Sequence, residues 1–232
     1  VYPNAIFNLA ESQFNLAEYE ESLKSYKRFF ALFPTHPYSA FALTRSGEII
    51  DILFKDRHRA QGFYNESFFR FRRSTGGTIA RMRSLSQRFK DMNKAELDDA
   101  IEEIRRREKK INLYQVDEFS AFMISDGYYH RGDFIEAANA LIDYFQINPK
   151  PVNIKKFERR ISRAIAGEVR EQIIDDNVVP AMSIIESHQK SWLSKSRRVD
   201  VQFFRAQAYE KMSLYQEALE SYQRIQRRIC LL

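Results

Sequence analysis

Hydrophobic residues recur along most of the chain at intervals of three and four, which is the spacing of one face of an α-helix. Between residues 155 and 174, for example, Phe157, Ile161, Ile165 and Val169 fall on one side of such a helix. No segment gives a convincing β-strand pattern, in which apolar and polar residues alternate. Glycine (7) and proline (6) are also scarcer than a turn-rich β fold would need. The pattern therefore predicts an all-α protein.

Three windows, at residues 5–34, 118–149 and 199–230, align without gaps. Each has a small residue in its first half and another twelve positions later: Ala10 and Ser22, Ser125 and Ala137, Ala206 and Ala218. An aromatic residue precedes the second small residue by three positions (Tyr19, Phe134, Tyr215), and a large residue follows it by four (Tyr26, Leu141, Tyr222). Small side chains let two helices approach closely. Each window therefore predicts a pair of antiparallel helices that cross at the small residues.

The segments between these paired helices are short enough to permit only a tight turn. They are Ala17-Glu18, Gly132-Asp133 and Ser213-Leu214. Pro34 and Pro149 follow the second helix of the first two windows, where proline ends the hydrogen-bond ladder.

This pattern resembles the tetratricopeptide repeat, a helix–turn–helix unit of 34 residues. The resemblance covers the three windows, and it departs from the family at Cys230, where proline is expected, and at Gln13, where an aromatic is usual. Phe14, next to Gln13, can supply the missing bulk. The resemblance implies a right-handed α-solenoid with a concave inner surface.

The gaps between the three windows leave room for more degenerate hairpins, which we expect at residues 37–73, 78–115 and 152–192. The chain would then form about six hairpins in a single superhelical domain over 1–232. Within it, Ser74 to Gly77 is interpreted as a break between helices. Asn93 with Glu96 predicts a helix start, and Pro180 suits the first turn of another helix. Because the chain does not begin with Met, we expect a fragment of a larger protein.

Charge is unevenly distributed along this basic chain, whose formal net charge is +6. Residues 55–90 carry ten basic and two acidic side chains, whereas residues 91–143 carry seven and thirteen. Two interpretations stay open: neighbouring helices neutralise each other, or the basic block forms a docking surface for an acidic partner.

Residues able to support catalysis or metal binding do not form a recognisable motif. The histidines lack the spacing of a zinc site, and there is no glycine-rich phosphate loop. The acidic pairs Asp98-Asp99 and Glu102-Glu103 are interpreted as the solvated face of a helix. Cys230 excludes an internal disulfide because it has no partner, and its terminal position argues against a nucleophile. We therefore expect no enzyme activity, no metal and no cofactor, and no apolar run is long enough to span a bilayer.

In the repeats that this chain resembles, the first helix of each hairpin lines the inner groove. The resemblance implies a partner-binding groove lined by Phe7, Glu11, Phe14, Asn15, Phe122, Asp126, Tyr129, His130, Phe203, Gln207, Glu210 and Lys211. Chaperone adaptors of the family grip a terminal carboxylate with Lys and Asn at the positions that here hold Phe7/Glu11, Phe122/Asp126 and Phe203/Gln207, and phenylalanine with an acid or amide cannot do that. An apolar helix or extended peptide is therefore a better ligand. The alternative is that the phenylalanines only pack between adjacent hairpins.

The basic block also contains aromatic residues, a combination that can bind nucleic acid. Its basic patch comprises Arg70, Arg72, Arg73, Arg81, Arg83 and Arg88. The aromatic residues recur at helical spacing, however, which is typical of a core and disfavours nucleic acid as the partner.

The segment Tyr26–Thr44 resembles a junction between repeats in bacterial envelope proteins, such as outer-membrane assembly lipoproteins and periplasmic division coordinators. This likeness favours the bacterial periplasm or outer membrane over the cytoplasm. The leading hypothesis is a non-catalytic scaffold that binds a partner protein or peptide in its concave groove. One alternative is an accessory helical domain of an envelope enzyme such as a cell-wall hydrolase. Another is nucleic-acid binding through residues 55–90.

Overall fold

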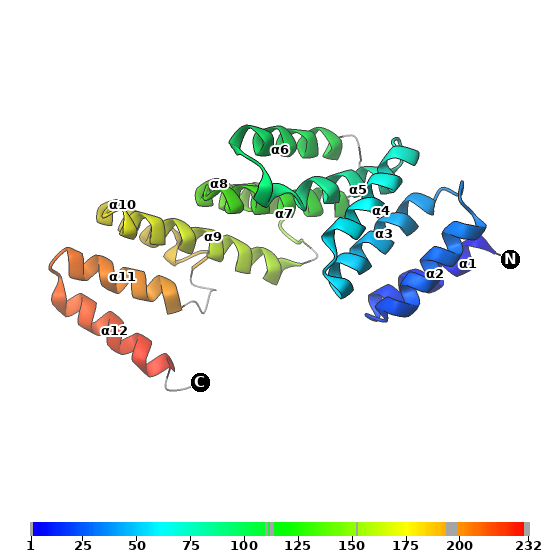
Figure 1. Ribbon diagram of the computed structural model, residues 1–232. Coiled ribbons are helices and arrows are strands. Elements are labelled where there is room, and N and C mark those ends of the chain that lie inside the picture. The colour runs from blue at the N-terminus through cyan, green and yellow to red at the C-terminus, as the bar shows by residue number, and fades with distance from the viewer. Residues whose placement is uncertain (1, 110, 112–113, 152, 194–198, 230–232) are drawn as a thin grey trace. The chain divides into compact units, whose positions relative to one another are not determined.

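The computed structural model describes the whole chain except residues 1, 110, 112–113, 152, 194–198 and 230–232. Cys230 thus lies outside the described residues. Over the part described, the protein is all-α and contains no strand (Figure 1). It divides into two compact units, residues 1–123 and residues 124–232.

Unit 1 consists of helices that alternate in direction. They are α1 (Pro3–Asn15), α2 (Tyr19–Leu32), α3 (Ser39–Ile49), the π-helical turn η1 (Ile50–Phe54), α4 (Arg57–Arg70), α5 (Thr75–Ser86), the 3-10 turn η2 (Phe89–Asp91) and α6 (Lys94–Glu108). Helix α7 (Tyr114–Arg131) begins in unit 1 and ends in unit 2. Unit 2 continues with α8 (Phe134–Ile147), α9 (Ile154–Ile174), α10 (Val178–Gln189), α11 (Val199–Lys211) and α12 (Tyr215–Ile229).

These helices confirm the all-α class and the helical hairpins predicted from the sequence. The helices α1 and α2, α3 and α4, and α11 and α12 pack directly on each other. The single superhelical domain over 1–232 stays a prediction.

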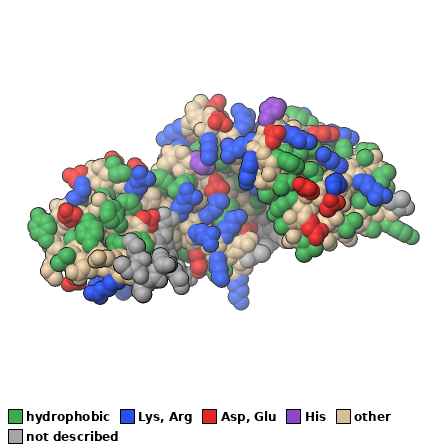
Figure 2. Space-filling view, turned by 60° about the horizontal axis from the view of Figure 1, so that its bottom comes forward, with side chains coloured by type: hydrophobic (Ala, Val, Ile, Leu, Met, Phe, Trp, Pro, Cys, Tyr) green, Lys and Arg blue, Asp and Glu red, His purple; other side chains and the backbone are tan. Residues whose placement is uncertain are grey.

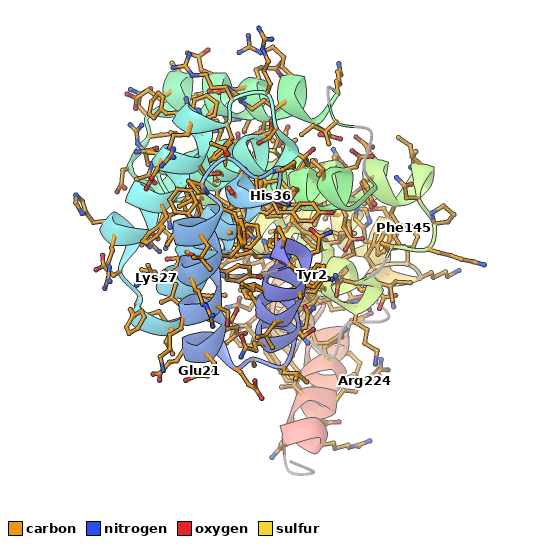
Figure 3. The ribbon with its side chains drawn as sticks, turned by 90° about the vertical axis from the view of Figure 1, so that its right-hand side faces the viewer. Tyr2, Glu21, Lys27, His36, Phe145 and Arg224 are labelled. Atoms are coloured by element: carbon orange, nitrogen blue, oxygen red, sulfur yellow. The ribbon has the colours of Figure 1, made fainter. Side chains whose placement is uncertain are left out.

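The small residues of the three aligned windows are all buried, as predicted. In the first hairpin the Ser22 hydroxyl donates to the carbonyl of Ala10 at 2.8 Å, so the two backbones are in close contact. In the α7–α8 hairpin the roles are exchanged, and the Ser125 hydroxyl donates to the carbonyl of Ala137 at 2.7 Å. A buried hydroxyl needs such a partner, because an unpaired one costs free energy. The outer face of α2 is polar instead, and Lys27 points away from α1 (Figure 3).

The tight turns share one backbone conformation. Ala17, Gly132 and Ser213 have φ angles of 61°, 90° and 60°, in the left-handed region that favours glycine. In each case the next residue's amide donates to a carbonyl five residues earlier, as Glu18 does to Gln13 at 2.9 Å. The connection is therefore the same helix-ending turn in all three windows.

A fourth hairpin, α9–α10, has this turn as well. Asp176 has a φ of 63°, and the amide of Asn177 donates to the carbonyl of Gln172 at 2.8 Å. Counting from the turn, buried Val169 and Ala181 occupy the two small-residue positions. The degenerate hairpin predicted at 152–192 is thus a further copy in the same register, with valine at the first of those positions.

The break between helices predicted at Ser74 to Gly77 lies instead at residues 71–74. Helix α5 begins at Thr75, and the Ser74 side chain accepts a hydrogen bond from the amide of Gly77 at 3.0 Å. A Cβ on Gly76 would lie 2.7 Å from the backbone nitrogen of Phe41, and one on Gly77 would lie 2.3 Å from the Phe71 carbonyl oxygen. The glycines are there because neighbouring backbone approaches α5, and sequence alone does not distinguish that role from a turn.

The helix start predicted at Asn93 is confirmed. Its side chain accepts from the amide of Glu96 at 3.0 Å, and the Glu96 carboxylate accepts from the amide of Asn93 at 2.9 Å. This reciprocal capping box satisfies backbone amides that have no partner in the helix. Pro180 lies in the first turn of α10, as predicted.

Replacing Gly77 by alanine should destabilise the protein by about 2–3 kcal/mol, because the new methyl group cannot fit beside the Phe71 carbonyl. Gly62 on α4 is the matched control, since a Cβ there meets nothing within 4 Å. Gly62→Ala should stabilise by roughly 0.5–1 kcal/mol through helix propensity. Urea unfolding of both variants measures the difference, and shifts of the same sign would contradict the packing described here.

The shared turn makes a second stability prediction. Gly132→Ala should destabilise by about 1 kcal/mol although a Cβ there has open space, because a φ of 90° strains an alanine. Ala17→Gly, at the same point of the first hairpin, should change stability in the opposite direction. Thermal unfolding of the two variants beside the parent chain tests this expectation, and destabilisation by both would argue against a common turn.

Candidate functional site

The phenylalanines expected in the groove are mainly packed against the chain itself. The Phe7 ring stacks on Tyr38 at 4.7 Å between centroids and contacts Phe29 at 5.5 Å. Phe122 is buried, with 7% of its surface exposed. Phe203 is exposed on one side and contacts Tyr222 with the other. Phe7 and Phe122 thus occupy packing positions.

Alternating charges run across the first helices of the unit 1 hairpins. The Arg45 guanidinium on α3 donates to Glu11 of α1 at 3.3 Å and to Glu48 at 2.7 Å. Arg83 on α5 donates to the other oxygen of Glu48 at 2.8 Å and lies 4.1 Å from the centre of the Phe119 ring on α7. We call Glu11, Arg45, Glu48 and Arg83 the ion ladder. Each charge of the ion ladder thus has an oppositely charged partner in the same chain.

Glu48 is the buried centre of the ion ladder, with 6% of its surface exposed. Burial acts to raise the pKa of its carboxyl group, but the cations of Arg83 and Arg45 outweigh burial and hold this pKa below its ordinary value. At the edge of the ladder, burial and the hydrogen bond to Glu11 raise the pKa of Tyr26 far above its ordinary value. These shifts favour the ionised form of the Glu48 carboxyl group and the neutral form of the Tyr26 hydroxyl.

In unit 2 the first helices of two successive hairpins enclose an open groove of about 450 Å³. It is lined by Ser125, Asp126, Tyr129 and His130 of α7 and by Lys156, Arg159, Arg160 and Arg163 of α9. We call it the α7–α9 groove. Lys and Arg side chains gather in the middle of the view in Figure 2, over the N-terminal half of α9. Three predicted groove residues, Asp126, Tyr129 and His130, thus line a real cavity.

The α7–α9 groove has four cations facing one carboxylate. Arg160 forms an ion pair with Asp126, and burial, together with the nearby Arg163 cation, lowers the pKa of Arg160. Arg163 donates to the Tyr129 hydroxyl at 3.0 Å, and its guanidinium lies 4.6 Å from the centre of that ring. The groove can therefore attract an anionic ligand.

The α9 cations were missed by the sequence analysis, although their spacing carries a signal. Lys156, Arg159, Arg160 and Arg163 stand at positions i, i+3, i+4 and i+7, which places them on one face of a helix. This face is adjacent to the apolar stripe that identified the helix. A separate search for basic stripes would have found it.

The other predicted groove residues do not join this cavity. Phe14 contacts Arg45 and Tyr19 within unit 1, and Asn15 is exposed. In unit 2, Glu210 accepts from the Tyr222 hydroxyl at 3.0 Å, and Lys211 pairs with Asp176. Gln207 is half-buried. A second cavity in unit 2, of about 330 Å³, is lined by Gln189, Val199, Gln202, Arg205, Arg224, Ile225 and Arg227, none of which was predicted.

Half of the predicted basic patch is paired with acids of the same unit. Arg70 donates to Glu66 at 2.9 Å, and Arg83 belongs to the ion ladder. Arg81 donates through two nitrogens to the Glu103 carboxylate, each at 2.9 Å. The other three, Arg72, Arg73 and Arg88, are exposed. Of these pairs, Arg81–Glu103 joins the basic segment 55–90 to the acidic segment 91–143, as the neutralisation interpretation expects.

Glu103 corrects one sequence-based expectation, since it is not simply solvated. It accepts from Arg107 at 2.8 Å as well as from Arg81, and these two cations hold its pKa below the ordinary value although burial acts to raise it. It lines a shallow cavity of about 480 Å³ between α5 and α6 together with Arg81, Leu85, Arg88, Met92, Glu96, Asp99, Ala100 and Arg106. Its three acids and three arginines balance, so this cavity has no excess charge to attract a ligand.

Among the described residues, no group of three or more His, Cys, Asp or Glu side chains could hold a metal ion. In that same part of the chain, none of the helices is both long and apolar enough to cross a membrane.

Comparison with known proteins gives only distant structural likenesses. No family model matches the chain. No curated protein matches it either. The chain is similar to a solved tetratricopeptide repeat protein from Parabacteroides merdae, with 11% identity and a TM-score of 0.47, over 97% of this chain and 92% of that one. It is also similar to a chain in the structure of Naa15/Naa10 bound to HypK-THB, with 15% identity and a TM-score of 0.39, over 97% of this chain and 37% of the other. Neither likeness assigns a function at these scores.

The ion ladder predicts a specific pH dependence. Because the pKa of Glu48 is depressed in the folded protein, the stability it contributes is present at neutral pH and is lost as the pH falls below the ordinary carboxyl value of 4.5. Glu48→Gln should destabilise by about 2 kcal/mol at pH 7 and by less in acid. Urea midpoints at several pH values measure both effects.

Glu66→Gln is the matched control for this change. Glu66 also pairs with an arginine, Arg70, but both side chains are about half exposed, so the loss should stay below about 0.5 kcal/mol. Equal losses in the two variants, or a Glu48→Gln loss that does not depend on pH, would contradict a buried ion ladder.

Proposed function

We propose that this chain is a non-catalytic scaffold that binds an acidic, extended segment of a partner protein in the α7–α9 groove. The observation that carries the proposal is the set of four cations that face a single carboxylate across an open cavity of about 450 Å³. The helical hairpins support a scaffold role, since stacked hairpins expose extended surfaces suited to binding.

The dimensions of the groove suit a short stretch of extended chain. Lys156 and Arg163 are two helical turns apart, which corresponds to about 10 Å along α9. An extended peptide covers that distance in about three residues. Acidic side chains at alternate positions of such a peptide would lie on one side, opposite the cations. Tyr129 and His130 add ring surfaces for the partner's apolar groups.

The arginines also suit carboxylates by their shape. A planar guanidinium presents donors in pairs that match the two oxygens of a carboxylate. Arg160 already pairs with Asp126, so a partner carboxylate would share or displace an existing contact. Arg163 is held against Tyr129, which orients its guanidinium before a ligand binds. The α7–α9 groove is therefore partly preorganised for an anion.

Nucleic acid is the competing anionic ligand, but the basic patch offers it less support. Three of its six arginines are paired with Glu66, Glu48 and Glu103. Tyr64 of the same block is buried and cannot stack on a base. The bacterial envelope setting and the attachment to an enzyme such as a cell-wall hydrolase stay predictions from the sequence. The proposed acidic ligand depends on neither.

Fluorescence polarisation with a labelled peptide of alternating Glu and Ser tests the proposal. The chain should bind this peptide, and the affinity should fall steeply with added salt. Lys156→Glu/Arg159→Glu, which reverses two charges of the groove wall, should weaken binding about tenfold or more.

The matched control is Lys155→Glu/Arg170→Glu, which makes the same charge change on the same helix outside the groove. This variant should change the affinity less than about threefold, through long-range attraction alone. Equal losses in both double variants would refute the groove. Stronger binding of an oligothymidine than of the peptide, lost on reversal of Arg72 and Arg73, would favour nucleic acid instead.

A further inference from the structure

The connection between α3 and α4 exposes three consecutive large apolar residues. Ile52, Leu53 and Phe54 of η1 are 42%, 38% and 49% exposed. η1 is a π-helical turn, and Lys55 directly after it has a φ of 55°, in the left-handed region. We call residues 52–54 the apolar tip. Insertions of this kind in helices are rare and are frequent at functional sites.

Large apolar residues are also exposed around the α11–α12 turn, where Met212, Leu214 and Tyr215 are 43%, 37% and 67% exposed, but that connection has no π-helical turn. The corresponding turns at Ala17-Glu18, Gly132-Asp133 and Asp176-Asn177 are built from small or polar residues. They connect their helices directly, without a π-helical turn. Since the shorter connection is sufficient to form a hairpin, the apolar tip is not required by the fold.

A further exposed apolar residue lies at the same end of unit 1. Helices α1 to α4 alternate in direction, so the α1–α2 turn and η1 are at the same end of their hairpins (Figure 1). Leu16, just before that turn, is 71% exposed.

Cations flank the apolar tip. Lys55, Arg57 and Arg59 follow it within five residues, and all three are exposed. Two acids, Asp51 and Asp56, lie on either side of the apolar tip. The Asp56 carboxylate caps α4 by accepting from the amide of Arg59 at 2.9 Å, and Asp51 is half-buried. Three exposed cations thus follow the apolar tip, beside one exposed acid, Asp56, and one half-buried acid, Asp51.

We propose that the apolar tip inserts into the surface of an anionic lipid bilayer, with Lys55, Arg57 and Arg59 at the level of the headgroups. Insertion of apolar side chains and attraction of cations to anionic lipid are the two contributions that hold peripheral proteins on membranes. This attachment is separate from the α7–α9 groove and does not rest on the proposed function.

The shape of the surface favours lipid over a protein partner. A protein that buried the apolar tip would need a matching pocket, whereas fluid lipid adapts to a protruding side chain of any shape. The three cavities described above contain no residue of the apolar tip, so the tip is not the edge of a binding pocket among them. Lipid therefore accounts for the exposed apolar side chains and for the adjacent cations together.

Sedimentation with vesicles tests this proposal with the full chain. The protein should pellet with vesicles of phosphatidylcholine mixed with phosphatidylglycerol, and should stay in solution with phosphatidylcholine alone. Leu53→Ser/Phe54→Ser should lower the partition coefficient about tenfold or more. Lys55→Gln/Arg57→Gln should lower it and weaken its dependence on salt.

Leu32→Ser is the matched control, because Leu32 is 49% exposed and lies at the opposite end of α2 from the α1–α2 turn. This variant should bind like the parent, and circular dichroism of all variants establishes that they are folded. In a Trp192→Phe background, Phe54→Trp should show a blue-shifted emission on vesicles, whereas Leu32→Trp should not.

Three results would overturn the proposal. The first is no binding to anionic vesicles at low salt. The second is binding that survives Leu53→Ser/Phe54→Ser but is lost with Lys156→Glu/Arg159→Glu, which would assign it to the α7–α9 groove. The third is a concentration-dependent dimer that Leu53→Ser/Phe54→Ser dissociates, which would make the apolar tip a contact between two copies of the chain.

Discussion

The close crossing of the two helices in each repeat is the constraint on which the rest of the structure depends. At Ala10 and Ser22 the backbones are near enough for a serine hydroxyl to reach the carbonyl of the facing helix. The α7–α8 hairpin makes the same contact with donor and acceptor exchanged between its two helices. A residue larger than the valine that the α9–α10 hairpin carries at this position would push the helices apart, and the aromatic residues around the crossing would lose their contacts. The crossing thus decides which side chains are buried between the two helices and which stay at the surface.

A single repeat position behaves differently in the two units because of its neighbours. Glu11 and Asp126 occupy the same position of their hairpins, and each pairs with an arginine from the first helix of the following hairpin. In unit 1 that arginine is shared with Glu48, so the charges satisfy one another. In unit 2 the nearby Arg163 meets the ring and hydroxyl of Tyr129 instead of a second acid. The fold therefore supplies the position, and the residues on the next helix decide whether the surface attracts an anion.

Prediction from sequence succeeded for the hairpins, whereas the partner-binding groove stays a prediction. Asp126, Tyr129 and His130, which the repeat register implied as groove residues, line a cavity between α7 and α9. The expectation failed to include Arg160, whose partner Asp126 lies 34 positions earlier in the chain. It also treated Glu103 as solvated, although an arginine on α5 reaches it. Charges at helical spacing identify a face, but not the element that packs against it.

The sequence by itself determined the helices, their crossings and several of their ends. These features depend on residues a few positions apart, or on the two helices of one hairpin, so a short window contains the information. Only the tertiary structure decided that Gly76 and Gly77 belong to a helix, that Glu48 is held by two arginines, and that Phe54 is left exposed. The Gly76 and Glu48 environments depend on the approach of α5 to α3, which the spacing of residues within one helix does not reveal.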